Sequence, residues 1–305
     1  MRKYQIIIGN KELVLDYSSD NPSGPQIQFN IQQFSVSQTV NAEITLYNIA
    51  PYYFSMNQYL IGKQIQLFAG VEDTPITRMV GYSGQYGLIA AGFISAVIPE
   101  WNGNDTSLSI IFMPQPVIAS AVPYLLKVNK GQDIRSLFID AYKAITGNAE
   151  NIDLGTTPIL STTSYQQKID NVSDIALTLQ QQHGITLNQT KAGFQVNTVV
   201  GKNINLVPGD FVTQPSALNI SQVALTLQLR ADVQIGDYVK LPSNVYVGIT
   251  VLDSIRVQSQ LNAFQNKNVF LLFSGLYLIS KIWQLGDSHN PNPEAWATIL
   301  HGVRA

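Results

Sequence analysis

Strict alternation of apolar and polar side chains is the feature that most constrains this chain. It is plainest between residues 27 and 46, in two runs separated by a polar break at 37–39 and ended by Pro51. A period of two residues places all apolar side chains of a strand on one face, and proline bars further ladder bonding. The segment therefore predicts two antiparallel strands with one buried face. Their apolar positions are Ile27, Phe29, Ile31, Ala42, Ile44 and Leu46.

The same alternation predicts strands along much of the chain. At the start, 4–8 and 12–16 are expected to form a hairpin around a tight Gly9-Asn10 turn, because these residues tolerate a positive φ. Gly92 is expected to permit a bulge or a close approach of two backbones. The polar stretch 254–268 is expected to be an exposed or disordered loop. Further strands are predicted at 64–68, 88–97, 106–112, 223–229, 238–241, 245–252 and 269–273.

The period changes to that of helices in the middle of the chain. One predicted helix has Asp133 as its N-cap and Gly147 as its stop, and a second is capped by Asn171 and Asp174 and ends at Gly184. A hairpin of 185–187 and 194–197 follows. This region is therefore expected to form a compact α/β insert. The buried face of the first helix is expected to carry Ile134, Leu137, Phe138, Ala141 and Ile145.

Charge is scarce in this sequence. Only 12% of the 305 residues are charged, against roughly 25% in an ordinary soluble domain, and the formal net charge is −2. No basic patch typical of nucleic-acid binding is visible. A charge-poor surface favours extensive protein–protein contact, although a secreted β-protein with a hydroxyl- and amide-rich surface fits the composition equally well. The chain has no cysteine, which removes disulfides and thiolate chemistry.

No targeting or membrane signal is evident. The apolar run Ile6-Ile7-Ile8 is far too short for the core of a signal peptide, and no run approaches the ~18 residues that a spanning helix needs. We therefore expect a protein that is soluble in the cytoplasm where it is made.

The residues able to do chemistry are dispersed. The histidines are His183, His289 and His301; the first is expected to place an imidazolium at a helix C-terminus, and the last lies near a C-terminus expected to be exposed. No pair has the spacing of a metal-binding helix, and no cysteine completes a zinc site. We expect no metal site, no cofactor and no enzymatic activity.

Three other motifs have structural explanations that we prefer. The glycine-rich stretch 81–87 lacks the Gly-Lys-Ser/Thr of a phosphate-binding loop, and Ser83 lacks a nucleophile elbow. Glu100 and Asp105 flank Trp101 as in a glycosidase cleft, but a solvated turn is the favoured interpretation. The aromatic cluster of residues 52–54 and 59 resembles a sugar platform, yet packing on the protein or on a neighbouring subunit is favoured.

Several short motifs, and the order in which they occur, resemble those of the baseplate hub proteins of contractile-tailed phages. The opening strand pair ends in Leu-Tyr-Asn-Ile at 46–49, and 222–229 is followed by Ile235-Gly236-Asp237. The most specific part is a final hairpin, in which Gln284 departs from the histidine that relatives tend to carry. That hairpin supplies the family-like residues Gly275, Tyr277, Gly286, Asp287 and Trp296.

The resemblance implies a mainly β (α+β) fold with two tail-tube-like β-barrel domains and a small α/β insert. We expect the domains at about 1–118, 119–200 and 201–305. This expectation allows a second barrel that is built from discontinuous segments of the sequence. The implied protein is a structural hub in the virion baseplate, assembled in the host cytoplasm. The alternative is a carbohydrate-binding or adhesive β-protein of a virion or cell surface.

The resemblance implies that the protein assembles into a ring of three copies that contacts other tail proteins. Three copies would present six similar units to a hexameric tail tube or tube adaptor on one side and threefold symmetry to a trimeric spike on the other. Other baseplate proteins would surround it. The channel would hold the tape-measure protein and pass DNA only in transit.

Overall fold

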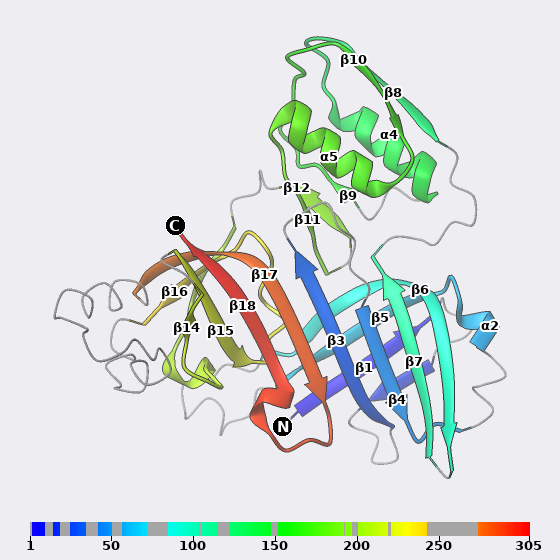
Figure 1. Cartoon of the computed structure of the whole chain (residues 1–305), viewed down its shortest axis with the longest axis vertical. Coiled ribbons are helices and arrows are strands. Elements are labelled where there is room, and N and C mark those ends of the chain that lie inside the picture. Colours follow the sequence, from blue (N-terminus) through cyan, green and yellow to red (C-terminus); the bar gives the residue numbers. More distant parts are fainter. Residues whose placement is uncertain are drawn as a thin grey trace.

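The structure is a computed structural model of the chain. It describes residues 2–9, 15–18, 25–34, 42–50, 57–71, 85–103, 105–114, 123–147, 152–191, 193–196, 201–218, 221–242 and 274–305. The predicted strands at 245–252 and 269–273, the loop 254–268 and the cluster 52–54 lie outside these residues. Figure 1 shows two β-rich halves side by side and a separate α/β lobe above them. The mainly β fold class is confirmed.

The first β-half is an antiparallel arrangement in the order β3-β4-β7-β6-β5-β1-β2. Every predicted apolar position of β3 and β4 is buried, so the alternation rule held there. A single short helix, α2 (Asn57–Leu60), lies among the described residues of this half. The strands are β1 (Arg2–Ile8), β2 (Leu15–Ser18), β3 (Gln26–Phe34), β4 (Ala42–Tyr47), β5 (Gln64–Val71), β6 (Gly87–Asn102) and β7 (Asp105–Met113).

The long strand β6 changes partner halfway along its length. Its first part pairs with β5 and its second with β7, with an irregularity between Ile94 and Ala96. Gly92 lies at the change, and a Cβ there would be 2.2 Å from the carbonyl oxygen of Met113. The close backbone approach predicted for this glycine is confirmed.

The predicted tight turn after β1 is wrong. Ile8 pairs with Leu15, a register that a two-residue turn at Gly9-Asn10 cannot give. Gly9 continues the bonding between β1 and β5, its amide donating to the carbonyl of Gln64 at 2.8 Å, and Asn10 lies outside the described residues.

The insert has its own core between two helices and short strands. The second helix begins with the predicted capping box, in which Asn171 and Asp174 bond each other's backbone amides. The first helix begins one residue later than predicted, because Asp133 is held in a bridge with Leu160, although its carboxylate still accepts the amide of Arg135 at 3.2 Å. The elements are β8 (Tyr124–Val128), α4 (Arg135–Thr146), β9 (Ile152–Asp153), β10 (Tyr165–Ile169), α5 (Val172–His183), β11 (Leu187–Gln189) and β12 (Phe194–Val196).

The second β-half is centred on a three-strand antiparallel ladder, β15-β18-β17. Its odd-numbered leucines and valine, from 223 to 227, are fully buried as the alternation predicts. The strands are β13 (Asn203–Asn205), β14 (Ser216–Ala217), β15 (Gln222–Gln228), β16 (Tyr238–Leu241), β17 (Gly275–Asp287) and β18 (Trp296–Arg304), with short 3-10 helices at Pro208–Asp210 and Pro293–Ala295.

Strand β17 joins the two halves. Its first residues pair with β16, and its last, from Lys281 to Asp287, pair with β3 of the first half. One hydrogen-bonded sheet therefore runs through both halves, although each half keeps a separate hydrophobic core and the insert has a third. The domain boundaries at 118 and 200 remain our proposal, which these separate cores support.

The described helices include none that is long and apolar enough to cross a membrane.

Candidate functional site: the seam between the two β-halves

We call the pairing of β3 with β17, together with residues 288–296 that follow it, the seam. Of the five family-like residues, Gly286, Asp287 and Trp296 lie in it. Gly275 and Tyr277 lie at the opposite end of β17, within the second half. The sequence motif thus marks one long strand that begins in one core and ends against the other.

Close packing of Gly286 against an aromatic pair holds the seam together. A Cβ on Gly286 would be 2.1 Å from the ring of Phe29, so only glycine fits here without movement. That ring meets Trp296 edge to face, with centroids 5.4 Å apart. Trp296 is only 3% exposed, and its Nε1 donates to the carbonyl of Gly70 at 3.1 Å. A residue from the last strand therefore completes the core of the first half.

Asp287 fixes the turn that follows β17. Its carboxylate accepts the side-chain amide of Gln28 at 2.9 Å and the backbone amides of His289 and Asn290 at 3.0 and 3.2 Å. Burial opposes its ionisation, but these hydrogen bonds outweigh burial and leave the pKa of Asp287 below its ordinary value. The turn is thus tied to β3 by a charged acceptor.

Arg2 bonds the same turn from the N-terminal strand. Its guanidinium donates to the carbonyl oxygens of Asp287 at 2.9 Å and Asn292 at 2.8 Å, and also to that of Asn290. It also lies over the ring of Trp296, with Cζ 5.7 Å from the centroid. Three carbonyls and one aromatic face match the planar fork of arginine, which lysine does not reproduce.

The far end of β17 is held by Tyr277 in the second core. Tyr277 is fully buried, and Gly302 on β18 gives it room, since a Cβ there would be 2.9 Å from the Cβ of Tyr277. Gly275 begins the strand with φ +109°, a conformation that favours glycine. Both residues act within one half rather than at the seam.

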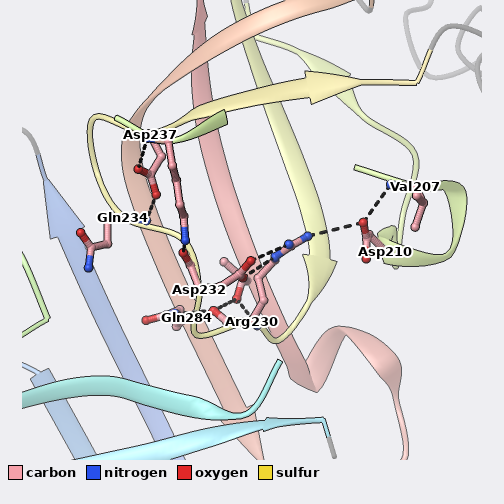
Figure 2. A network of polar contacts seen from close by, with 9 residues as sticks. Val207, Asp210, Arg230, Asp232, Gln234, Asp237 and Gln284 are labelled. Carbon is pink, nitrogen blue, oxygen red and sulfur yellow. Dashed lines mark hydrogen bonds and ion pairs between the residues drawn. The ribbon is translucent and has the colours of Figure 1, made fainter. Parts of the chain in front are cut away.

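A charge network that the sequence reasoning missed is centred on the buried Arg230 in the second half (Figure 2). Arg230 is 3% exposed, donates to both carboxylate oxygens of Asp232 at 2.8 and 2.9 Å, and lies 3.5 Å from Asp210. Burial opposes ionisation of Asp232, yet the bonds from Arg230 lower its pKa overall. Asp210 lies 20 residues before Arg230 in the sequence, and this separation gave no signal because only the fold brings the two charges together.

Gln284 connects this network to β17. It is fully buried, and its Nε2 donates to the carbonyl of Arg230 at 3.0 Å. The neighbouring Thr298 accepts the Arg230 amide at 3.0 Å. The residue that departs from the family pattern therefore has a structural role as a neutral donor.

The three histidines lie apart. His183 ends α5, and its Nε2 lies 2.7 Å from the hydroxyl of Tyr165. Burial lowers the pKa of His183, which favours the neutral imidazole rather than the expected imidazolium. His301 is a partly buried residue of β18 opposite Lys281, and the last two residues of the C-terminus near it are exposed, as expected. His289 lies in the turn after Asp287. The described part of the chain contains no group of three or more histidine or acidic residues able to hold a metal.

The remaining motifs also stay separate from the seam. Glu100 and Asp105 line a surface groove of about 370 Å³ at the end of the β6–β7 hairpin, and Trp101 is 65% exposed beside it. Tyr59, a residue of α2, is 72% exposed. The groove on the seam itself, about 350 Å³, is lined by polar and apolar residues alike, among them Asn30, Phe29 and Leu285, with Glu43 and Asp287 as its acids.

No protein-family model matches the sequence, and no curated protein matches it. Solved structures do match over the whole chain. The 43 kDa tail protein of prophage MuSo2 from Shewanella oneidensis has a TM-score of 0.55 at 10% identity, covering 98% of this chain and 96% of that one. A tail protein from Neisseria meningitidis has 0.54 at 8% identity, covering 99% and 96%.

A third match is an E. coli component of the type VI secretion system that is described as similar to the T4 bacteriophage tail proteins gp27 and gp5. Its TM-score is 0.53 at 8% identity, covering 98% of this chain and 76% of that one. This chain therefore has the fold of phage tail proteins, and the resemblance read from the sequence is confirmed at that level.

Proposed function

We propose that this chain is a structural tail protein that forms the baseplate hub as a ring of three copies. The ring joins a hexameric tail tube to a trimeric spike and encloses the channel for the tape-measure protein and DNA. It is a virion component assembled in the host cytoplasm, it works in a contractile tail during genome ejection, and it catalyses no reaction. The observation that carries the proposal is the full-length likeness to phage tail proteins.

The seam gives this proposal a physical basis. Two β-halves with separate cores share one ladder along β17, so each chain offers two β-units in a fixed relation. Three such chains supply six units to a hexameric partner while keeping threefold symmetry for the spike. Contacts around such a ring are heterologous, and they close only for one rotation.

The surface chemistry fits large contacts with other tail proteins. With 12% charged residues, the chain presents few groups whose desolvation would oppose burial. Among the described strands, β2 and β14 lie at the two ends of the strand order, and edges of this kind need protection, which a closed ring would supply.

Co-expression with the spike protein encoded near it tests the partner claim. Native mass spectrometry of the purified complex should give three hub chains for three spike chains. A complex of six or twelve hub chains would indicate a tube or adaptor component instead. Binding of the isolated chain to a glycan array would favour the adhesive alternative.

A further inference from the structure

Two buried glutamines lie on the inner face of the seam, one on each of its strands. In the β3–β17 ladder, Gln33 lies opposite Ile282, and Gln284 follows two residues later on β17. Because residues two apart in a strand share a face, the two glutamines are diagonal neighbours on the same side of the sheet. Gln33 is 2% exposed and Gln284 is fully buried. Diagonal neighbours are roughly 7–8 Å apart, which is within reach of side chains of this length.

The amide nitrogens of both glutamines have partners, and these partners lie in different halves. Nε2 of Gln33 donates to the carbonyl of Ile89 on β6 at 3.4 Å. Nε2 of Gln284 donates to the carbonyl of Arg230 at 3.0 Å, beside the charge network (Figure 2). Turning either amide round would place its oxygen against a carbonyl oxygen, and two acceptors cannot bond. The two donated bonds therefore fix the orientation of each amide group.

The amide oxygens of the two glutamines are in a different situation. Both Oε1 atoms are shielded from solvent, and neither accepts a hydrogen bond within the described residues. Buried acceptors in folded proteins are almost always bonded, either to the protein or to an ordered water. The two oxygens cannot satisfy each other, because each is only an acceptor. One group that satisfies both must supply two donor hydrogens from a position between them.

Water is the ligand whose chemistry fits this place. A water molecule carries two donor hydrogens and no charge, so it can bond both oxygens without bringing an ion into the core. A metal cation would need further oxygen ligands and a counter-charge, since an uncompensated buried charge is costly. Ile31 and Ile282, the ladder neighbours of the glutamines on this face, offer neither.

We propose that one buried water bridges the seam, donating one hydrogen to Oε1 of Gln33 and the other to Oε1 of Gln284. The bridge completes a chain of hydrogen bonds from the carbonyl of Ile89 in the first half to the carbonyl of Arg230 in the second. It ties β3 to β17 through their side chains, in addition to the backbone ladder. The inference is independent of the proposed function.

A high-resolution crystal structure of the whole chain tests the site directly. It should show an ordered water about 2.7–3.0 Å from Oε1 of both Gln33 and Gln284. Crystals grown in rubidium chloride should give no anomalous peak there, because rubidium would mark a cation site. A structure without a water that contacts both oxygens would overturn the proposal, and so would an anomalous rubidium peak at this place.

The bridge also predicts that the two glutamines are energetically coupled. Gln33→Met and Gln284→Met each keep a flexible side chain but remove one of the two acceptors of the water, which leaves the other acceptor without its donor. The double variant leaves neither acceptor. In urea unfolding, the unfolding constant of the double variant should therefore be about tenfold closer to that of the wild type than the product of the two single effects.

Gln33→Met combined with Thr178→Val is the matched control. Thr178 is also fully buried, but it lies on α5 of the insert, where its hydroxyl donates to the carbonyl of Asp174 at 2.6 Å. The effects of this pair on the unfolding constant should multiply to within about twofold. Coupling between the glutamines that is no larger than in this control would overturn the proposal.

A crystal structure of Gln284→Met separates a water bridge from direct coupling between the two side chains. The water should be lost from this variant, because only Oε1 of Gln33 remains to hold it. A water that stays in place at full occupancy would overturn the proposal. If a variant does not fold, as judged by circular dichroism, the wild-type crystal structure decides alone.

Discussion

The ring of Phe29 occupies the space where a side chain on Gly286 would begin, with only 2.1 Å between a built Cβ and ring atom Cε1. These residues lie opposite each other in the β3–β17 ladder. Because residue 286 is glycine, β17 can pair with β3, more than 250 residues earlier in the sequence, while the ring of Phe29 packs over the backbone at that point.

Gly286→Ala should destabilise the protein by about 3 kcal/mol, because the methyl group overpacks the seam and displaces Phe29. Urea unfolding measures the change. Gly62→Ala is the control: its φ is +79° but nothing lies near its Cβ, so it should cost only about 1 kcal/mol. The double variant with Phe29→Leu should recover part of the loss, and simple additivity would contradict the contact.

Arg2→Lys should weaken the turn at 288–292 although the charge is kept. The lysine ammonium cannot reproduce the forked donation to the carbonyls of Asp287 and Asn292, and about 1 kcal/mol should be lost. Faster hydrogen exchange confined to this turn is the expected readout. Unchanged exchange there would show that Arg2 contributes only its charge.

Asp287→Asn should make stability less dependent on pH in the acid range. The pKa of Asp287 is lowered in the folded state, so its ionised form stabilises the protein above the ordinary carboxyl pKa near 3.9. This stabilisation is lost as pH falls through the folded-state pKa. The melting temperature of the variant should be lower than that of the wild type at pH 7, and the difference should shrink by pH 3. A constant difference would contradict the pKa shift.

Arg230→Met should cost about 3 kcal/mol, because it leaves the buried carboxylate of Asp210 and the partly exposed carboxylate of Asp232 without their cation. Arg135→Met is the matched control, since the Arg135–Asp133 pair is more exposed to solvent and should contribute much less. Equal losses of unfolding free energy in the two variants would show that burial does not strengthen the contribution of the Arg230 network.

The sequence rules succeeded where interactions between neighbouring residues determine the structure. Alternation placed Ile27, Phe29 and Ile31 in a core, and Asn171 with Asp174 formed the expected capping box. The position of the turn after β1 was mispredicted, since Ile8 pairs with Leu15 and the local preference of Gly9-Asn10 for a tight turn did not decide this register.

The sequence revealed the seam only through a motif on one of its two strands. Gly286, Asp287 and Trp296 were singled out by resemblance, but their partners could not be, since pairing of β17 with β3 depends on the tertiary fold. Arg230 gave no signal at all. Arginine is ordinarily a surface residue, and its burial here follows from the tertiary packing around it.

Electron cryomicroscopy of the assembled tail, or of the hub bound to its spike, tests the central claim most directly. The account predicts three copies of this chain in a ring with pseudo-sixfold symmetry around an open channel, the β3–β17 ladder lying within each copy. Six or twelve copies, or a ring with a solid centre, would contradict it.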